Sequence, residues 1–311
     1  MSEDVFATGA DARYGYHLVN LLGSVKANSN IFDRLVAFDL GMTDHQRTLV
    51  DAIPGVERRV VPPFSPHWSQ CFTWKPWAWM QLSGERVFWL DAGSTVLRRL
   101  ATALGQVSEL GYFLVSQENE LRDIVPPDYF ARYGVPEDVA ERPYVAAGIL
   151  GFRPGGDFFE RVLAPTYEDC LAGHNLGFSP GEVAARNRGI SRMQSPPLRD
   201  CRHFRWDQTI LNVHLALAAP HAQVADLDEY GGWQSPHDHP EQVIWNHRRS
   251  GNLRYLKRVP YKGPSAWRFR LWGAWWQVRW LLKPHKRFVQ PMTYLLKARA
   301  IGRTLTRRAL S

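Results

Sequence analysis

Residues 86–93 read RVFWLDAG, and the class of fold follows from what precedes and follows them. Arg86–Leu90 predicts a buried strand, because a short apolar run bounded by turn residues is typical of a sheet covered on both faces. Asp91, Ala92 and Gly93 then lie at the carboxyl end of that strand. In α/β sheets, ligands bind at this end.

Apolar runs of strand length alternate with helical patterns along most of the chain. The other predicted strands are Val5–Thr8, Leu35–Leu40, Val56–Val61, Tyr112–Ser116 and Val145–Phe152. The predicted helices are Tyr14–Ala27, Thr43–Ile53, Thr73–Leu82, Leu97–Leu110, Asp157–Leu171 and Asp207–Leu217. This alternation predicts an α/β fold with a Rossmann-like, mixed but mostly parallel sheet covered by helices. The proline-containing residues 120–145 indicate a surface insertion, and residues 172–204 indicate a long loop.

Composition is that of a folded protein, with 45% hydrophobic and 22% charged residues among 311. No apolar run approaches the roughly 20 residues that a membrane-spanning helix needs. The amino-terminal residues lack the basic and apolar regions of a signal peptide. The three cysteines have no zinc-type spacing. We therefore expect a cytoplasmic protein.

Charge is distributed unevenly along the chain. Of the 38 Lys and Arg, 17 lie in residues 242–311, which contain no Asp or Glu. The other 21 are outnumbered by the 30 Asp and Glu of residues 1–241. A basic segment on an acidic body indicates a polyanionic partner. We therefore divide the chain into residues 1–250 and a basic, Trp-rich helical extension of residues 251–311.

Residues 266–282, AWRFRLWGAWWQVRWLL, fit one helix with a broad apolar arc, and residues 292–310 continue the basic pattern. Arg268 and Arg279 fall inside the arc, where a core helix rarely tolerates them. At a bilayer surface, Arg heads reach lipid phosphates while Trp occupies the interface. The sequence thus predicts that residues 266–311 bind an anionic membrane. Nucleic acid is the rival partner, but no recognised binding motif is present.

Four segments appear in a particular order. They are Thr8-Gly9-Ala10-Asp11, Trp74-Lys75-Pro76-Trp77, Val87–Gly93, and Ala146–Leu150 together with Trp206–Asn212. In this order and spacing they resemble the GT-A glycosyltransferases, particularly the retaining enzymes of family 8 and related bacterial sugar transferases. The resemblance covers roughly residues 4–250.

The resemblance implies roles for individual residues. The nucleotide-sugar donor would be bound by Thr8, Gly9, Ala10, Asp11, Lys75, Asp91, Ala92 and Gly93. Ala147 and Gly148 would let the acceptor approach the strand backbone. Asp207 would contact sugar hydroxyls, and Gln208 would lie opposite the departing phosphate. Structural roles as helix caps or packing positions are the alternatives. We expect Asp91 and Asp207 to face each other across one site.

The resemblance also implies a divalent cation, Mn²⁺ or Mg²⁺, bound by Asp91 and a late histidine, His247. The chain departs from the family here, because Gly93 replaces the second Asp of the Asp-x-Asp motif. Without a metal, the diphosphate would need Arg248, Arg249, Arg254 or Lys257, since guanidinium groups match phosphate in bidentate fashion.

These features predict a hexosyltransferase, retaining in stereochemistry. It would transfer a sugar from a nucleotide-diphosphate donor, with UDP-sugar preferred, to a lipid-linked or polysaccharide acceptor. We expect it to be peripheral on the inner face of the plasma membrane. Two alternatives stay open: a catalytically degenerate GT-A-like protein that binds a nucleotide sugar or a partner, and a nucleic-acid-binding protein that uses the basic extension.

Overall fold

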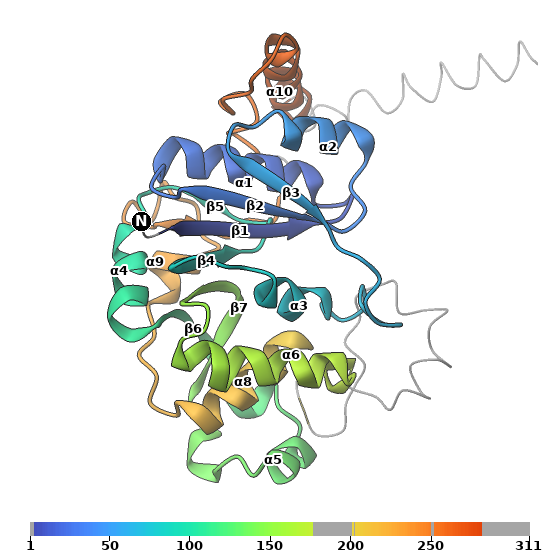
Figure 1. Ribbon diagram of the computed structural model, residues 1–311. Coiled ribbons are helices and arrows are strands. Elements are labelled where there is room, and N and C mark those ends of the chain that lie inside the picture. The colour runs from blue at the N-terminus through green and yellow to red at the C-terminus, as the bar shows by residue number, and fades with distance from the viewer. Residues whose placement is uncertain (1–2, 177–200, 202, 250–251, 282–311) are drawn as a thin grey trace, which may run out of the picture.

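A computed structural model describes residues 3–176, 201, 203–249 and 252–281 of the protein (Figure 1). Its centre is a six-stranded sheet in the order β3-β2-β1-β4-β7-β6. The strands are β1 (Asp4–Ala10), β2 (Arg34–Asp39), β3 (Val56–Val60), β4 (Arg86–Leu90), β6 (Tyr112–Glu120) and β7 (Pro143–Phe152). All six strands predicted from the sequence are therefore confirmed.

The sheet is mixed but mostly parallel, as predicted. Strands β1, β2, β3 and β4 pair in parallel, whereas β7 is antiparallel to both β4 and β6. Because β1 and β4 are parallel neighbours, Ala10 at the end of β1 and Asp91 just after β4 lie at the same edge of the sheet. A second, two-stranded sheet pairs β5 (Thr95–Val96) with β8 (Ile244–Trp245) and so joins the loop after β4 to a distant part of the chain.

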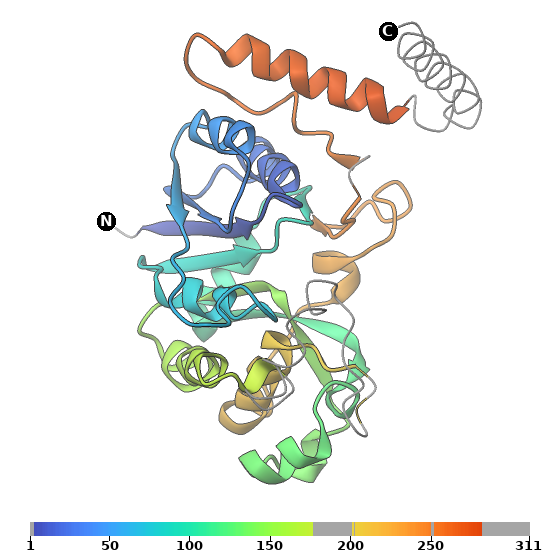
Figure 2. The same ribbon diagram turned by 90° about the vertical axis from the view of Figure 1, so that its right-hand side faces the viewer.

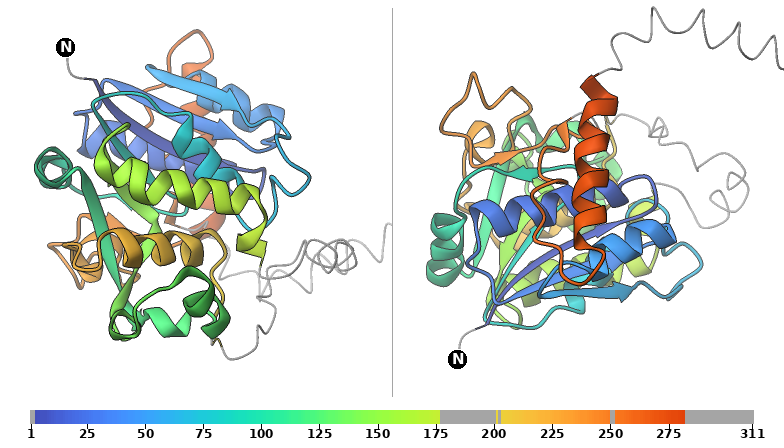
Figure 3. Two further views of the ribbon diagram at one scale, coloured as in Figure 1. Left: turned by 60° about the horizontal axis from the view of Figure 1, so that its bottom comes forward. Right: turned by 90° about the horizontal axis from the view of Figure 1, so that it is seen from above.

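Helices cover both faces of the main sheet (Figures 1 and 3). The α-helices of the described residues are α1 (Gly15–Asn28), α2 (Asp44–Asp51), α3 (Trp74–Met80), α4 (Ala101–Leu110), α5 (Pro127–Tyr133), α6 (Ala164–Leu171), α8 (Asp207–Ala218), α9 (Leu227–Gly231) and α10 (Ala266–Leu281). The predicted helix over 157–171 includes a π-helical stretch, Phe159–Leu163, before α6. Local sequence explains several boundaries. For example, α2 begins with a capping box between Thr43 and Gln46.

The segment 120–145 is more ordered than the predicted surface insertion. It contains α5, and its apolar residues form a separate core cluster with α8 that includes Leu121, Ile124 and Tyr144. Proline at the first turn of α5 favours helix rather than loop, which explains the difference. Of the predicted loop 172–204, residues 177–200 and 202 lie outside the described residues.

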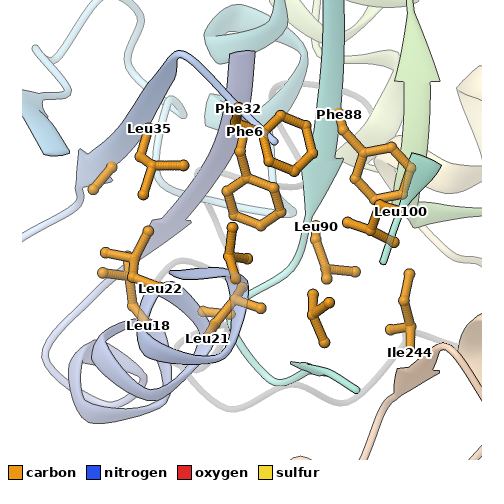
Figure 4. Close-up of a cluster of buried hydrophobic side chains, with 14 of the residues drawn as sticks. Phe6, Leu18, Leu21, Leu22, Phe32, Leu35, Phe88, Leu90, Leu100 and Ile244 are labelled. Atoms are coloured by element: carbon orange, nitrogen blue, oxygen red, sulfur yellow. The ribbon is translucent and has the colours of Figure 1, made fainter. Parts of the chain in front are cut away.

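Side chains of the central strands alternate between two apolar clusters, one on each face of the sheet. In β1, Phe6 and Ala10 belong to the cluster beneath α1 and α4, whereas Val5 and Ala7 belong to the cluster beneath α3 and α8. Figure 4 shows the first cluster, in which leucines of α1 pack over Phe6. These two cores fix β1 and β4, and with them the residues at their carboxyl ends.

Residues after the predicted boundary at 250 contribute to the same core. Leu253, Leu256 and Val259 are fully buried in the α1 cluster. The chain then forms α10, which lies across α1 and α2 (Figures 2 and 3). The division of the chain into two functional parts stays a prediction, and residues 282–311, including the basic stretch 292–310, lie outside the described residues.

The predicted apolar arc of α10 is divided between two environments. Trp272 and Trp276 pack on Tyr16 of α1, with ring centroids 4.9 Å apart in each case. Trp267, Leu271, Trp275 and Val278 are instead 50–60% exposed. In the part of the chain that the structure describes, no helix has the length and hydrophobicity to cross a bilayer.

Candidate active site

Lys75 lies between two acidic side chains that are far apart in the sequence. Its Nζ is 3.1 Å from Asp91 Oδ2 and 3.3 Å from Asp207 Oδ2. Asp91 follows β4, Asp207 is the first residue of α8, and Lys75 is in the first turn of α3. The expectation that Asp91 and Asp207 come together at one site is confirmed. The sequence did not predict that a lysine bridges them.

Two of these three charges are almost inaccessible to water. The side chains of Lys75 and Asp207 are 5% and 4% exposed, whereas that of Asp91 is 32% exposed. Burial raises the pKa of Asp207 to about 6, although Lys75 opposes the shift. Burial alone would lower the pKa of Lys75, but the two carboxylates outweigh it and raise that pKa. At neutral pH the lysine is therefore a fixed cation, and Asp91 is the member of the group that faces solvent.

The backbone around this group is strained. Among the described residues, the non-glycine residues with positive φ are Cys71, Phe72, Trp206 and Arg248. The first two precede α3, and Trp206 directly precedes Asp207. The Phe72 ring packs on Trp206 at 5.5 Å between centroids and lies 5.1 Å from Lys75 Nζ. Such conformations persist where the surrounding structure enforces them, and they cluster at functional sites.

Several contacts hold Asp91 in place. Its Oδ1 accepts a hydrogen bond from Trp89 Nε1 at 3.1 Å, and its backbone N–H donates to the carbonyl of Gly148 at 2.8 Å. A Cβ at Gly148 would lie 2.7 Å from Asp91 Oδ2, closer than atoms approach without displacement. Gly148 is therefore needed to leave room for the carboxylate.

The residues of the predicted donor-binding segment at the end of β1 differ in their burial and contacts. Thr8 is fully buried, and its Oγ1 has no hydrogen-bond partner among the described residues. Gly9 makes room for Trp74, whose ring would lie 2.6 Å from an added Cβ. Ala10 is buried in the core. Asp11 is exposed and accepts hydrogen bonds from the backbone N–H groups of residues 13 and 14, so it shapes the turn before α1.

Amide side chains attach α8 to β7. Asn212 accepts the backbone N–H of Val145 at 2.7 Å and donates to its carbonyl at 3.0 Å. Gln208 Nε2 donates to the same carbonyl at 2.8 Å. Gln208 is thus a tether as well as a neighbour of Asp207. Ala147, predicted to lie near the acceptor, is buried in the core, and its functional role stays a prediction.

The predicted metal ligand His247 is buried and engaged at both ring nitrogens. Its Nε2 lies 2.8 Å from Thr95 Oγ1, which also accepts a hydrogen bond from Asn20. Its Nδ1 accepts the backbone N–H of Arg249 at 3.1 Å. Burial lowers the pKa of His247 to about 4, so the imidazole is neutral. It connects β8 to β5 and α1.

These residues do not fit a divalent cation. Asp91 supplies one carboxylate, and both of its oxygens already have partners in Trp89 and Lys75. Gly93 supplies no side-chain oxygen. Among the described residues, no group of three His, Cys, Asp or Glu is placed to bind a metal ion. Mg²⁺ is usually bound by one or two carboxylates together with substrate phosphates, and here the one solvent-accessible carboxylate of the group is already paired with the Lys75 ammonium.

Comparison with solved structures identifies the fold. The bifunctional glycosyltransferase WbbM, in its apo form, superposes with a TM-score of 0.52 at 12% identity, over 86% of this chain and 51% of that one. The chain thus spans about half the length of the WbbM structure. The galactosyltransferase LgtC, in complex with donor and acceptor sugar analogues, gives 0.45 at 16% identity over 87% and 95%. Mouse xyloside xylosyltransferase 1 gives 0.42 at 11% identity over 79% and 97%.

The chain has a GT-A-like glycosyltransferase fold, as the sequence resemblance implied. Comparison of the sequence with protein-family models and with curated proteins found no match.

Several residues of the site carry no sequence signal. Phe72 and Trp206 are not residue types that favour positive φ, so their strained backbone is not predictable. Trp89 reads as an ordinary core residue of the apolar strand, yet its indole N–H fixes Asp91. The strand-end position of Asp91, the segment containing Lys75 and the motif containing Asp207 pointed to this region.

We expect Lys75→Met to destabilise the protein by about 3–5 kcal/mol at pH 8, because it leaves buried carboxylates without their cation. The loss should shrink as the pH falls. Without Lys75 the pKa of Asp207 rises above its already raised value, so protonation relieves the folded state at lower pH. Urea unfolding at pH 5 and pH 8 measures both effects. Lys75→Met/Asp207→Asn is the control and should be less destabilised at pH 8. An equal loss at both pH values would contradict the ion-pair explanation.

Gly148→Ala is expected to destabilise the protein by about 1–3 kcal/mol, because the new methyl group displaces Asp91. Gly105→Ala is the matched control. Gly105 lies within α4 with no atom within 4 Å of an added Cβ, so alanine there should be neutral or stabilising. Thermal unfolding of both variants tests the contrast, and equal melting temperatures would show that Asp91 has room to move.

Proposed function

We propose that this protein is a glycosyltransferase that transfers a hexose from a nucleotide-diphosphate donor, preferably a UDP-sugar, to a hydroxyl group of a lipid-linked or polysaccharide acceptor. The GT-A-like fold supports the general activity. The Lys75 group with Asp91 and Asp207, at the carboxyl edge of the sheet, supports the location of the site.

One observation carries the proposal. Asp207 is 3% exposed, and the only partner of its Oδ2 among the described residues is the ammonium group of Lys75, at 3.3 Å. A carboxylate oxygen can accept more than one hydrogen bond, and unfilled acceptor capacity in a buried site is costly unless a ligand supplies a donor. Sugar hydroxyl groups are donors of the right kind. Asp207 would accept a hydroxyl of the transferred sugar, and Lys75 would position Asp207 without touching the substrate.

We assign retention of configuration to the reaction. The only side chain predicted to lie opposite the departing phosphate is Gln208, an amide and therefore a poor nucleophile. The bond between the anomeric carbon and the phosphate oxygen would break first, giving an oxocarbenium-like ion paired with the nucleotide diphosphate. The acceptor oxygen would then attack from the same face, and its proton would pass to the departing phosphate. Asp207 stabilises the positive charge that develops on the sugar.

Asp207→Asn preserves shape but removes the charge, and we expect it to lower kcat/KM for a UDP-sugar by about 10- to 100-fold, in line with losing a hydrogen bond to a charged group. In the wild type, kcat/KM should fall as the pH falls through about 6, because protonation of Asp207 removes the acceptor charge. The variant should lack this limb. Release of UDP, followed across pH 5–8, measures both.

Asp157→Asn is the control, since the Asp157 side chain is 81% exposed and contacts only Arg161, one helical turn away, among the described residues. If the wild type binds nucleotide sugars with no turnover, the protein is a degenerate, binding-only member of this fold. If it neither binds nor hydrolyses any nucleotide sugar, the proposal is wrong.

We further propose that α10 and the basic residues after it dock the enzyme on an anionic bilayer at the inner face of the plasma membrane. The outer face of α10 exposes Trp267, Leu271, Trp275 and Val278. Arg268 lies over the Trp267 ring and Arg279 over the Trp275 ring, at 5.3 and 5.5 Å from the centroids. Exposed apolar residues flanked by arginines match the chemistry of a lipid interface, and residues 242–311 carry no acidic side chain to oppose it.

The triple variant Trp267→Ser/Leu271→Ser/Trp275→Ser should lower partitioning into vesicles containing phosphatidylglycerol at least tenfold, because each buried apolar side chain contributes about 1.5–3 kcal/mol. Flotation of the full chain measures this. The control is Val60→Ser/Leu217→Ser, which removes exposed apolar residues elsewhere. Retention of RNA without flotation would favour the nucleic-acid partner instead.

A further inference from the structure

The structure gives a physical reason for the glycine that replaces the second aspartate of the motif. A Cβ at Gly93 would lie 2.8 Å from Cγ of Arg248 and 3.7 Å from its Cβ and Cδ. The backbone N–H of Arg248 donates to the Gly93 carbonyl at 2.9 Å, so the arginine cannot move away freely. The place where an aspartate side chain would begin is occupied by the stem of an arginine.

The surrounding structure holds Arg248 in this position. Its φ is +49°, in the left-handed region, which costs a residue with a side chain about 1–2 kcal/mol. The preceding residue is fixed because His247 is buried and bonded through both ring nitrogens. Just before it, β8 pairs with β5, which directly follows the Asp91–Gly93 turn. The position of Arg248 next to that turn is therefore set by a sheet and a buried side chain.

The guanidinium group of Arg248 has hydrogen-bonding capacity left for a ligand. The side chain is exposed, its guanidinium lies 5.6 Å from the Trp233 ring centroid, and its Nε has one long contact of 3.4 Å to Asn246. None of the ion pairs in the described part of the chain includes Arg248. Lys75, by contrast, is neutralised by Asp91 and Asp207. The stem of Arg248 thus lies against the turn, and its guanidinium group does not already serve an acidic partner in the described part of the chain.

We propose that Arg248 binds the diphosphate of the donor from the position of the missing metal ligand, so that the protein binds nucleoside diphosphates without a divalent cation. The inference rests on the proposed function, because it assumes a nucleotide donor at this site. A guanidinium can donate two parallel hydrogen bonds to a phosphate and neutralise charge on the leaving group. The guanidinium would supply the positive charge that a divalent cation would otherwise provide, because the residues around Asp91 lack the ligands to bind one.

Calorimetric titration of UDP into the full-length protein, in EDTA and in Mn²⁺, tests the proposal. The wild type should bind with dissociation constants that agree within about twofold in the two buffers. Arg248→Met keeps most of the length of the side chain and should weaken binding in EDTA at least tenfold. Arg249→Met is the matched control, because it removes a neighbouring exposed arginine, and it should change binding less than threefold.

A second pair of variants tests whether the stem of Arg248 occupies the space that an aspartate side chain at position 93 would need. Gly93→Asp alone should weaken UDP binding in both buffers, since its side chain collides with Arg248. Gly93→Asp/Arg248→Ala removes the collision and supplies a second carboxylate, so binding should become dependent on Mn²⁺. Circular dichroism melting of each variant confirms that the fold is intact.

The outcomes distinguish failure of the proposed role of Arg248 from failure of the proposed transferase function. Wild-type binding that is lost in EDTA and restored by Mn²⁺ would overturn the role of Arg248 and leave the transferase proposal standing. The same holds if Arg249→Met, but not Arg248→Met, weakens binding. If UDP, GDP, CDP, ADP and dTDP all fail to bind in either buffer, the proposed function itself is wrong, and this inference falls with it.

Discussion

The contact of one buried ammonium group with two carboxylates organises this molecule. Lys75 brings together the end of β4, the first turn of α3 and the start of α8. The elements α3 and β4 are consecutive in the chain, whereas α8 is far from both in the sequence. Removing charges from water is unfavourable, and the attraction within the group offsets that penalty only when the geometry is tightly held. Much of the nearby structure holds it. Gly148 leaves space for Asp91, Trp89 bonds its carboxylate, and the Phe72 ring lies against the ammonium group.

Much of the fold could be predicted from the sequence because the local signals agree with the tertiary structure. The apolar runs of β1, β2 and β4 are buried on both faces, so their residues show no polar alternation to confuse the pattern. The helix of residues 127–133 could not be predicted in the same way. It is short, flanked by prolines, and stabilised by packing on α8, which only the folded chain brings near.

The two acidic residues of the candidate site could be predicted from the sequence, but the contacts that join them could not. Asp91 and Asp207 occupy positions with recognisable surroundings, a strand end and a motif-bearing helix. Nothing local indicates that Lys75 bridges them, that Phe72 and Trp206 adopt positive φ, or that Gly93 faces the stem of Arg248. Residues 93 and 248 are distant in the chain, and their contact depends on the pairing of β5 with β8. The same limit explains α10, where a helical pattern cannot show which aromatic residues pack on Tyr16 and which remain exposed.

The hydrogen bonds from the side-chain amides of α8 to β7 fix the position of this helix along the strand. Asn212 presents to Val145 the acceptor and the donor that a neighbouring strand would present, so the helix is locked in register with β7. Asp207 reaches Lys75 from one end of that helix because Asn212 is anchored just over one turn further on. A single inserted or deleted residue between them would rotate Asp207 by about 100° around the helix axis. Insertions and deletions beyond Ala218 or before Trp206 leave this spacing unchanged, whereas between Asp207 and Asn212 only substitutions preserve it.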